Sequence, residues 1–552
     1  MLARERAPAK KYKTLHPHPV PAGCARAAPR IDRVKLLDLI AGVEMPATRA
    51  GAGAQASGIR IVGDASVEVE FLAYDSRKVG PGTLFFCVPG ERVDGHEFAG
   101  AAVDAGAAAL VVEWELGLDV PQVVVEDARA AMAPLAARFF GDPTRELRVV
   151  GITGTNGKTT TAFLLRETLE AAGVRCGLLG TVKQVVGGVE EDVERTTPEA
   201  IDLQETFRRM LEVGDRACVM EVSSHALALH RSDSIDFEVA LFTNLTQDHL
   251  DFHGRNLPDL EEKMEAYFRS KRLLFEMGPR ASIVNVDDPY GRRLAEEFDC
   301  QTFSATGTEA DFEAHNVSFD TTGAQFTLNC PPTGLERPNS GRSRPIGRGI
   351  GVRTRLPGDF NVANALGAFA VTAALGVAPD VAAAGLARAE RVPGRFEPVD
   401  EGQPFAVLVD YAHTPDSLEN VLRAARRLTE GRLISVFGAG GDRDRGKRPK
   451  MGRAGSTLSD LAVVTSDNPR SEDPDAIVAE ILAGIESGAA VEVEPDRRAA
   501  IALALGRARP GDTVVIAGKG HEQGQEFEDG RKIPFDDREV AREELRKLVS
   551  PA

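Results

Sequence analysis

A seven-residue loop between an apolar run and an amphipathic segment constrains the fold of this chain more than any other feature. Residues 148–153 (Arg-Val-Val-Gly-Ile-Thr) predict a short buried strand, and the apolar spacing of residues 161–170 predicts a helix. The loop between them consists of Gly154, Thr155, Asn156, Gly157, Lys158, Thr159 and Thr160. A strand, a glycine-rich loop and a helix in this order predict a phosphate-binding unit of an α/β sheet.

The residue types in this loop suit the binding of nucleotide phosphate. Glycines let backbone N–H groups close around phosphate oxygens, the helix N-terminus adds a positive field, and Lys158 supplies a mobile charge. Thr159 can offer its hydroxyl to Mg²⁺. The general pattern has a glycine five residues before Gly157, but position 152 is Ile, so the loop is a shortened variant. The alternative is an ordinary glycine turn between a strand and a helix.

Length and charge narrow the class of protein. A chain of 552 residues is too long for one domain and predicts three or four. The net charge of −17 argues against a general nucleic-acid binder. No apolar run has membrane-spanning length and no secretory signal is present, so we expect a soluble protein without membrane contact. The six cysteines are scattered without metal-ligand spacing, which predicts reduced thiols.

Changes in composition divide the chain into four segments. Residues 1–33 are rich in Ala, Pro and basic residues and are expected to be a disordered extension, although a transit peptide has the same bias. The expected domains are 34–147, 148–392 and 393–552. Within the second, residues 331–355 are rich in Gly, Pro, Arg and Ser, which predicts a loop or insertion.

The last segment predicts a second ligand site. Its expected strands are 406–410, 433–437, 461–465 and 513–517, and each ends in a polar or glycine-rich cluster: 410–413, 438–443, 467–470 and 518–522. In an open parallel sheet, ligands bind just beyond the carboxyl ends of the strands. Two sheets with facing sites suggest a reaction carried out between domains.

Glu221 and His249 each follow a predicted buried strand of the second segment, on the same sheet edge as the phosphate loop. A carboxylate and an imidazole suit a Mg²⁺ ion held mainly by phosphate oxygens. Either residue alone is more simply a hydrogen-bonded structural group, and only the shared edge favours a metal site.

Five motifs together resemble the Mur ligases of peptidoglycan synthesis: residues 151–160, 221–225, 243–254, 410–415 and 440–443. The resemblance covers about residues 34 to 545, and the shortened phosphate loop is the form that this family uses. It implies an α/β fold of three domains. These are a small N-terminal UDP-binding domain, a central mostly parallel sheet like that of P-loop ATPases, and a C-terminal Rossmann-like sheet.

The resemblance implies an ATP-dependent amide ligation in cytoplasmic cell-wall synthesis, and so a role in cell shape and division. The match is closest to the branch that adds meso-diaminopimelate to the D-Glu of UDP-N-acetylmuramoyl-L-alanyl-D-glutamate. ATP would convert the D-Glu side-chain carboxylate into an acyl phosphate, which the incoming amine attacks. The implied protein is a monomer that needs Mg²⁺.

The resemblance also implies roles for individual residues. The catalytic residues would be Lys158, Glu221, His249 and Lys271, and the metal ligands would be Thr159, Glu221, His249 and Lys271 as its carbamate. ATP would also contact Asn361, Asn364, Arg395 and Asp410. The UDP-muramoyl-dipeptide would contact Ser76, Gly95, His96, Thr196, Thr197, Ser223 and Arg231. Diaminopimelate would contact Arg443, Asp467, Asn468, Pro469, Arg470, Gly518 and Glu522.

The choice of amino acid depends on Arg470. Diaminopimelate has a second carboxylate at its far end, which lysine lacks, and a guanidinium can bind a carboxylate in a bidentate pair. Two other ligases of the same architecture are the alternatives: one adds lysine to the muramoyl-dipeptide, and the other adds glutamates to folate. A third alternative, from another class, is a switch protein in which ATP only sets the conformation.

Overall fold

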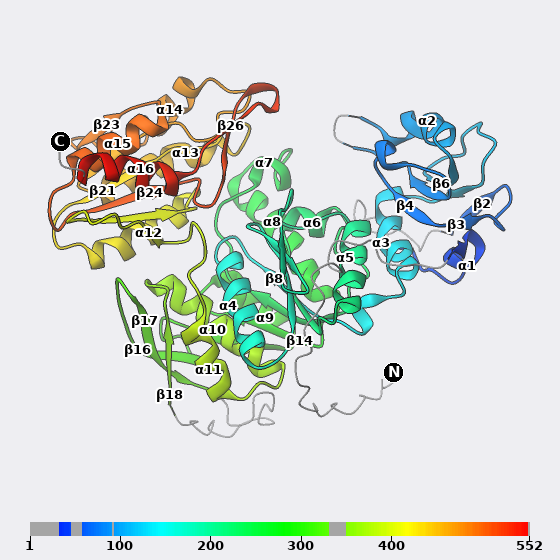
Figure 1. Ribbon diagram of the computed structural model, residues 1–552, viewed down its shortest axis with the longest axis horizontal. Coiled ribbons are helices and arrows are strands. Elements are labelled where there is room, and N and C mark those ends of the chain that lie inside the picture. The colour runs from blue at the N-terminus through cyan, green and yellow to red at the C-terminus, as the bar shows by residue number, and fades with distance from the viewer. Residues whose placement is uncertain (1–32, 46–57, 91–92, 331–348, 550–552) are drawn as a thin grey trace.

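The computed structural model describes residues 33–45, 58–90, 93–330 and 349–549. It contains three large sheets, each of which lies within one of the three expected domains. The central sheet lies between the other two, with the N-terminal part on one side and the C-terminal part on the other (Figure 1). This arrangement confirms the expected three-part α/β fold. The expected disordered extension lies outside the described residues, apart from Arg33.

The N-terminal part is a five-stranded sheet in the order β2 (Arg60–Val62), β7 (Gln122–Val124), β6 (Ala107–Val112), β5 (Thr83–Phe86) and β4 (Phe71–Ala73). Its helices are α1 (Leu36–Ile40), α2 (Ala99–Asp104) and α3 (Ala128–Phe139). The apolar run at residues 67–72 predicts one strand, but the structure has two there. β3 (Glu68–Val69) pairs antiparallel with β1 (Val34–Lys35), and β4 joins the larger sheet. The apolar spacing of residues 34–41 predicts a helix, but residues 34 and 35 form β1 and the helix begins only at Leu36.

The central part is an eleven-stranded sheet whose middle strands run parallel. Their order is β9 (Cys176–Leu179), β12 (Ala217–Glu221), β8 (Arg148–Thr153), β13 (Phe237–Phe242), β14 (Ala281–Asn285), β15 (Cys300–Ser304) and β16 (Phe312–Asp320). Antiparallel strands extend both edges: β10 (Gln184–Val186) with β11 (Val189–Glu191), and β17 (Gly323–Asn329) with β18 (Ile350–Thr354). Strands β8 and β12 are buried almost throughout, as expected for parallel strands covered on both faces.

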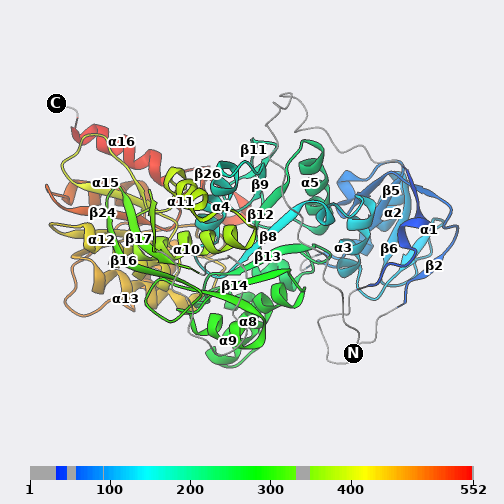
Figure 2. The ribbon, with the colours of Figure 1, turned by 90° about the horizontal axis from the view of Figure 1, so that it is seen from below.

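Helices cover both faces of the central sheet (Figure 2). One apolar core lies between the sheet and α4 (Lys158–Ala171), α10 (Asp359–Ala374) and α11 (Pro379–Arg388). The other lies against α5 (Ala200–Glu212), α8 (Leu260–Glu276) and α9 (Pro289–Glu297). The sheet is therefore the middle layer of three.

The prediction of a loop or insertion at 331–355 is wrong at the C-terminal end of that range. Residues 331–348 lie outside the described part of the chain, but Ile350–Thr354 form strand β18. Only Val352 and Thr354 of this strand are buried, because its other face is open to solvent. Gly351 and Arg353 stand at exposed positions, so the strand lacks the continuous apolar run of a central strand.

The C-terminal part is a six-stranded sheet in the order β19 (Glu397–Pro398), β20 (Ala406–Asp410), β24 (Thr513–Ala517), β21 (Leu433–Phe437), β22 (Leu461–Val464) and β23 (Val491–Val493). All strands except β19 run parallel, which confirms the expected Rossmann-like sheet. One face carries α12 (Pro415–Leu428), α13 (Arg448–Leu458) and α14 (Pro474–Leu482), and the other carries α15 (Arg497–Arg507) and α16 (Asp537–Val549). A separate hairpin of β25 (Gly524–Glu526) and β26 (Lys532–Pro534) follows β24.

Candidate active site

One cavity of about 820 Å³ lies between the central and C-terminal sheets. The phosphate loop lines it from the central part, together with residues that follow β12 and β13. Arg395, Arg443, Arg470 and Glu522 line it from the C-terminal part. The two sites predicted on separate sheets therefore face one space, which we call the central cavity.

Two glycines of the phosphate loop have backbone angles that other residues avoid. Gly154 has a φ of 143° and Gly157 a φ of 87°. A Cβ atom at Gly154 would lie 1.9 Å from Oγ1 of Thr243, and one at Gly157 would lie 2.3 Å from Oδ1 of Asn364. The loop therefore packs so closely against the loop after β13 and against α10 that only glycine fits.

Two cations lie at the phosphate loop. Nζ of Lys158 donates to the carbonyl oxygens of Gly154 (3.0 Å) and Thr155 (2.8 Å), and burial lowers the pKa of Lys158. Arg395, from the junction before β19, donates from Nη2 to Oγ1 of Thr159 at 3.1 Å and stacks 4.4 Å above the ring of Tyr411. Its buried Nε has no hydrogen-bond partner within the described chain. A phosphate in this loop would thus meet positive charge from both sheets.

Glu221 is buried at the end of β12 and accepts three hydrogen bonds. Its Oε2 receives the hydroxyls of Thr159 (2.9 Å) and Thr181 (3.1 Å), and its Oε1 receives the backbone N–H of Thr181 (2.8 Å). The described residues contain no group of three or more His, Cys, Asp or Glu side chains able to hold a metal by themselves. A hydroxyl and a carboxylate side by side are the oxygen donors that suit a Mg²⁺ ion completed by phosphate.

His249 lies near the phosphate loop and has a left-handed backbone (φ 54°). Its ring packs edge-on against His225, with 4.8 Å between the centroids. Burial lowers the pKa of His249 to about 3, so the imidazole is neutral at pH 7 and able to act as a ligand.

Lys271 lies in the core of the central part, outside the lining of the central cavity. Its Nζ donates to the carbonyl of Gly154 at 2.7 Å and lies 4.6 Å above the ring of Tyr267. Burial, with a smaller contribution from Lys158, lowers the pKa of Lys271 well below its ordinary value. The ammonium is thus disfavoured and the amine is held directly behind the phosphate loop.

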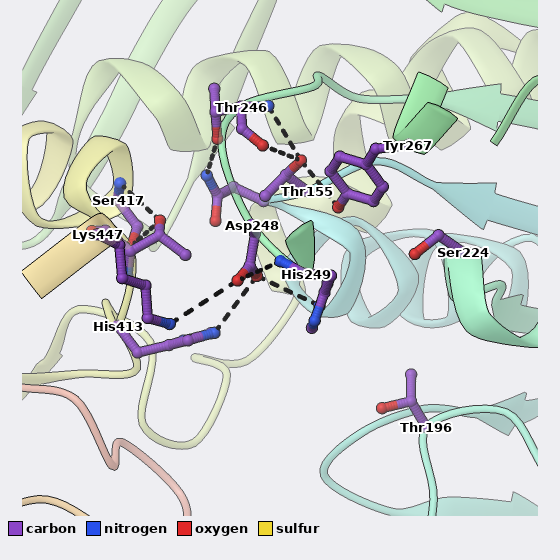
Figure 3. A network of polar contacts seen from close by, with 12 residues as sticks. Thr155, Thr196, Ser224, Thr246, Asp248, His249, Tyr267, His413, Ser417 and Lys447 are labelled. Carbon is purple, nitrogen blue, oxygen red and sulfur yellow. Dashed lines mark hydrogen bonds and ion pairs between the residues drawn. The ribbon is translucent and has the colours of Figure 1, made fainter. Parts of the chain in front are cut away.

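Asp248, which the sequence reasoning did not single out, connects the two sheets (Figure 3). Its carboxylate lies 3.2 Å from Nε2 of His249, and 3.8 Å both from Nε2 of His413 and from Nζ of Lys447. Burial alone would raise the pKa of Asp248, but His249, Lys447 and His413 hold it well below its ordinary value. Asp248 belongs to the 243–254 motif, so the sequence did carry a signal for it.

The residues expected to contact the dipeptide lie together along the central cavity: Thr196, Thr197, Ser223 and Arg231. Oγ1 of Thr197 donates to the backbone oxygen of Glu221 at 2.9 Å and accepts from the N–H of Ser223 at 3.1 Å. Arg231 pairs with buried Glu199 at 3.0 Å. Glu199, also missed from the sequence, pairs with Arg129 and Arg195 as well, and so joins α3 to the central part.

A second cavity, of about 920 Å³, lies between the N-terminal and central parts. Ser76 and Gly95 line it, and Arg195 lines both this cavity and the central one. His96 points elsewhere. Its Nδ1 lies 2.7 Å from Asp94, its Nε2 accepts from the N–H of Glu113 at 3.0 Å, and its ring stacks 3.9 Å from Trp114. Both ring nitrogens of His96 are therefore occupied within the chain.

The residues expected to contact the nucleotide base and ribose are mostly held by the fold. Asn364 lines the central cavity and donates to Asn361 at 3.1 Å, while Asn361 donates to the carbonyl of Pro357 at 2.8 Å. Asp410 also lines the cavity. It accepts N–H groups from Phe396 (2.7 Å) and Ala412 (2.8 Å), and burial raises the pKa of its carboxyl.

Several of the residues expected to contact the amino-acid substrate lie together at the carboxyl ends of β22 and β24. Nδ2 of Asn468 donates to Oε2 of Glu522 at 2.9 Å. Lys519, missed from the sequence, is fully buried and donates to both Asn468 (2.8 Å) and Glu522 (2.9 Å). Arg470 and Glu522 line the central cavity and also a third, outer cavity of about 1160 Å³.

Three of the residues expected to contact the amino-acid substrate line neither of these cavities: Asp467, Pro469 and Gly518. Asp467 lies against Gly518, where a Cβ atom would come within 2.5 Å of its Oδ2. Burial would raise the pKa of Asp467, but Lys519 and Arg497 lower it. These residues shape the strand ends behind the cavity.

In the described chain, none of the helices combines the length and apolarity that a membrane span requires.

Comparison with protein families assigns three segments of the chain. Residues 152–372 match the Mur ligase middle domain, and residues 394–520 match the glutamate ligase domain of Mur ligases. Residues 68–140 match the catalytic domain of the Mur ligase family. The matched segments follow the three sheets in order.

Curated relatives match over nearly their whole length. The UDP-N-acetylmuramoyl-L-alanyl-D-glutamate--2,6-diaminopimelate ligase of Streptomyces coelicolor is 47% identical over 498 residues, which cover 88% of this chain and 94% of the relative. The enzyme of the same name from Solibacter usitatus is 46% identical, over 87% of this chain and 94% of the relative. A solved structure of an enzyme of that name is 29% identical, with a TM-score of 0.62, over 94% of this chain and all of the other.

Proposed function

The chain belongs to the Mur ligase family, and on this premise we propose that it joins meso-diaminopimelate to the D-Glu of UDP-N-acetylmuramoyl-L-alanyl-D-glutamate at the expense of ATP. The observation that carries the proposal is the central cavity. It is lined at once by the phosphate loop, by Thr196, Thr197, Ser223 and Arg231, and by Arg470 and Glu522. A phosphate donor, a carboxylate and an amine can therefore meet in one cavity.

The reaction has two steps. The D-Glu carboxylate oxygen attacks the γ-phosphorus, the bond from that phosphorus to the β–γ bridging oxygen breaks, and ADP leaves. The amine of diaminopimelate then attacks the acyl carbon, phosphate leaves with the electrons of the C–O bond, and the amine loses a proton as the amide forms. A free carboxylate is a poor acyl donor at neutral pH, and phosphorylation provides the leaving group.

The chain's own residues supply charge and alignment for these steps. Lys158 and Arg395 approach the γ-phosphate from the two sheets and neutralise the charge that develops during transfer. Thr159, Glu221 and His249 are the residues that would hold Mg²⁺, which when bound supplies positive charge at the phosphate oxygens. Asn364, Asn361 and Asp410 would lie at the base and ribose of ATP.

We assign the UDP group to the second cavity, at Ser76 and Gly95. From there the muramoyl-dipeptide would extend past Arg195 to Thr196, Thr197, Ser223 and Arg231. His96 would support this cavity from behind, since Asp94 and Glu113 occupy its ring nitrogens. Arg470 would take the distal carboxylate of diaminopimelate, and Arg443 and Glu522 would bind the remaining charged groups. Asp467, Asn468, Pro469 and Gly518 would shape that pocket.

We propose that the amine of Lys271 is converted into a carbamate by CO₂. Its buried amine has a lowered pKa, and an uncharged amine is the form that adds to CO₂ with loss of one proton. The resulting anion beside Gly154 would lie close to the metal ligands and would extend their charge. We also propose that the domains are residues 34–147, 148–392 and 393–552, and that the protein acts as a cytoplasmic monomer.

A panel of amino acids tests this function. Purified protein with ATP, Mg²⁺ and the UDP-muramoyl-dipeptide is expected to release phosphate with meso-diaminopimelate and far less with lysine or glutamate. Mass spectrometry of the product must show a gain of one diaminopimelate less one water. Equal turnover with lysine would overturn the proposed specificity, and phosphate release that needs no amino acid would indicate a switch protein.

A further inference from the structure

The hairpin β25–β26 holds the loop that carries Arg470. The backbone N–H of Arg470 donates to the carbonyl of Glu526 at 3.1 Å, and the N–H of Glu526 donates to Oδ1 of Asn468 at 3.0 Å. Nε2 of Gln525 donates to the carbonyl of Asp467 at 2.6 Å. These three bonds join β25 to residues 467–470 along their whole length, so the position of that loop depends on the hairpin.

The side chain of Glu526 also holds the side chain of Arg470. Nε of Arg470 donates to Oε2 of Glu526 at 3.0 Å, and its Nη1 donates to the carbonyl of Gly441 at 2.8 Å. Within the described chain these are the two bonds that the guanidinium makes, and they leave both N–H groups of Nη2 and one of Nη1 for a ligand. The backbone of Arg470 has a φ of 52°, which non-glycine residues seldom adopt, so its local geometry is tightly fixed.

Glu526 acts on Arg470 from outside the central cavity. Arg470 and Glu522 line both the central and the outer cavity, whereas Glu526 lines only the outer one. Glu526 therefore holds the guanidinium at the boundary between the two cavities without itself reaching the space where the amide would form. Its side chain is about one-third exposed (32%) and that of Arg470 one-fifth (20%).

We propose that Glu526 is a positioning residue that aims Arg470 at the distal carboxylate of the incoming amino acid, and so sets the preference for a diamino dicarboxylate. The proposal rests on the proposed function. A long arginine side chain loses conformational freedom when it binds, and a partner that already fixes its plane removes part of that cost. Because the N–H of Nε and one N–H of Nη1 are taken, the donors left for the substrate are the two N–H groups of Nη2 and the second one of Nη1, and their direction depends on Glu526.

The opposite role would be competition, in which Glu526 occupies the guanidinium until substrate displaces it. The two roles predict opposite effects of Glu526→Ala on the KM for diaminopimelate. Positioning predicts a KM about 10-fold higher, equivalent to about 1.4 kcal/mol of lost binding. Competition predicts a lower KM. Glu526→Gln retains an oxygen acceptor for Nε but loses the charge, and is expected to lie between Glu526→Ala and the unaltered protein.

Steady-state kinetics with diaminopimelate, lysine and ATP as the varied substrates test the inference in the full-length protein. In Glu526→Ala we expect a higher KM for diaminopimelate, with kcat and the KM for ATP within about 2-fold of the unaltered protein. The kcat/KM for lysine should not change, because lysine has no distal carboxylate for Arg470 to bind. Glu528→Ala, at an exposed acidic residue of the same hairpin, is the matched control and should leave all constants unchanged.

A double-mutant cycle separates positioning from damage to the fold. In an Arg470→Ala background, Glu526→Ala should have no further effect on kcat/KM for diaminopimelate, because the side chain that it aims is absent. A full additional loss in that background, an equal loss for lysine, a lower KM or no effect would each overturn the inference. If the unaltered protein does not ligate diaminopimelate, the proposed function fails instead, so the two failures are distinguishable.

Discussion

In the proposed function, Arg470 is the residue on which the choice of amino acid depends. The sequence suggested a bidentate grip on a carboxylate, but Nε and Nη1 of Arg470 are already bonded to Glu526 and Gly441. A bidentate pair through Nε would require the bond to Glu526 to break, whereas an end-on pair through Nη1 and Nη2 would leave it intact. The guanidinium is therefore a prepared donor at the end formed by Nη1 and Nη2, with most of its orientation set before substrate arrives.

Replacing Arg470 tests this role directly. Arg470→Ala should raise the KM for diaminopimelate by about 100-fold, because a charged hydrogen bond is lost and a substrate carboxylate is left unpaired. The KM for ATP should stay within about 3-fold, since Arg470 makes no contact with the phosphate loop. Initial rates with each substrate varied in turn provide the measurement. Equal effects on the two KM values would show that Arg470 supports the fold rather than the amino acid.

Lys271 is the residue whose role depends most on its protonation. Burial lowers the pKa of Lys271 well below its ordinary value and so favours the uncharged amine, which is the form that adds to CO₂. Lys271→Ala should remove most ligase activity, and a short carboxylate such as acetate should restore part of it by filling the vacated space with an anion. The same acetate added to Arg470→Ala serves as the control and should restore nothing. Wild-type activity in Lys271→Ala would disprove the carbamate.

At the scale of elements, the pair α15–α16 fixes the strand ends of the amino-acid site. Arg497 of α15 and Asp537 of α16 form a fully buried pair with bonds of 2.8 and 2.7 Å. Arg497 also donates to the backbone oxygens of Ser466 (3.3 Å) and Ala517 (3.0 Å), the residues just before the clusters at 467–470 and 518–522. One guanidinium thus holds the ends of β22 and β24 together.

Neighbouring arginines of α15 provide a matched pair of variants. Arg497→Ala leaves a buried carboxylate and two strand-end carbonyls without their donor, so we expect a loss of about 3–5 kcal/mol in the free energy of unfolding. Arg498 pairs with Glu543 and Glu544 of the same helix α16, but at the surface. Arg498→Ala should therefore cost less than about 1 kcal/mol. Urea denaturation compares the two, and similar losses would contradict a special role for the buried pair.

How far an element could be predicted depended on how many of its faces are buried. Strands such as β8, β20 and β24 are covered on both sides, so their apolar runs were visible in the sequence. β18 and the β25–β26 hairpin each leave one face or edge exposed, and their polar residues resembled a loop. The sequence predicted motif residues that line the central cavity, such as Lys158 and Arg470, but it did not single out Glu199 or Glu526. Glu199 pairs with Arg129 and Arg231, and Glu526 with Arg470, and these arginines lie far away in the chain.

At the scale of the whole molecule, the site exists only while the central and C-terminal parts stay together. Gln247 of the central part donates to Asp444 at 2.9 Å and accepts from Lys450 across the boundary. Asn156 of the phosphate loop donates to Asp416 at 2.9 Å, and Asp248 pairs with His413 and Lys447. Polar contacts of this kind can form and break as substrates bind and leave, unlike a continuous apolar core.

Gln247→Ala tests whether these contacts hold the central cavity closed. The variant loses two hydrogen bonds across the boundary but none within either sheet, so each part should unfold as before. We expect small-angle X-ray scattering to give a larger radius of gyration without substrates, and we expect kcat/KM to fall about 5-fold for ATP and diaminopimelate alike. The common fall follows because both substrates need the closed arrangement. Gln325→Ala, at an exposed position of β17 within the central sheet, is the control. An unchanged radius together with lowered activity would mean that Gln247 acts locally, on the loop that carries Asp248 and His249.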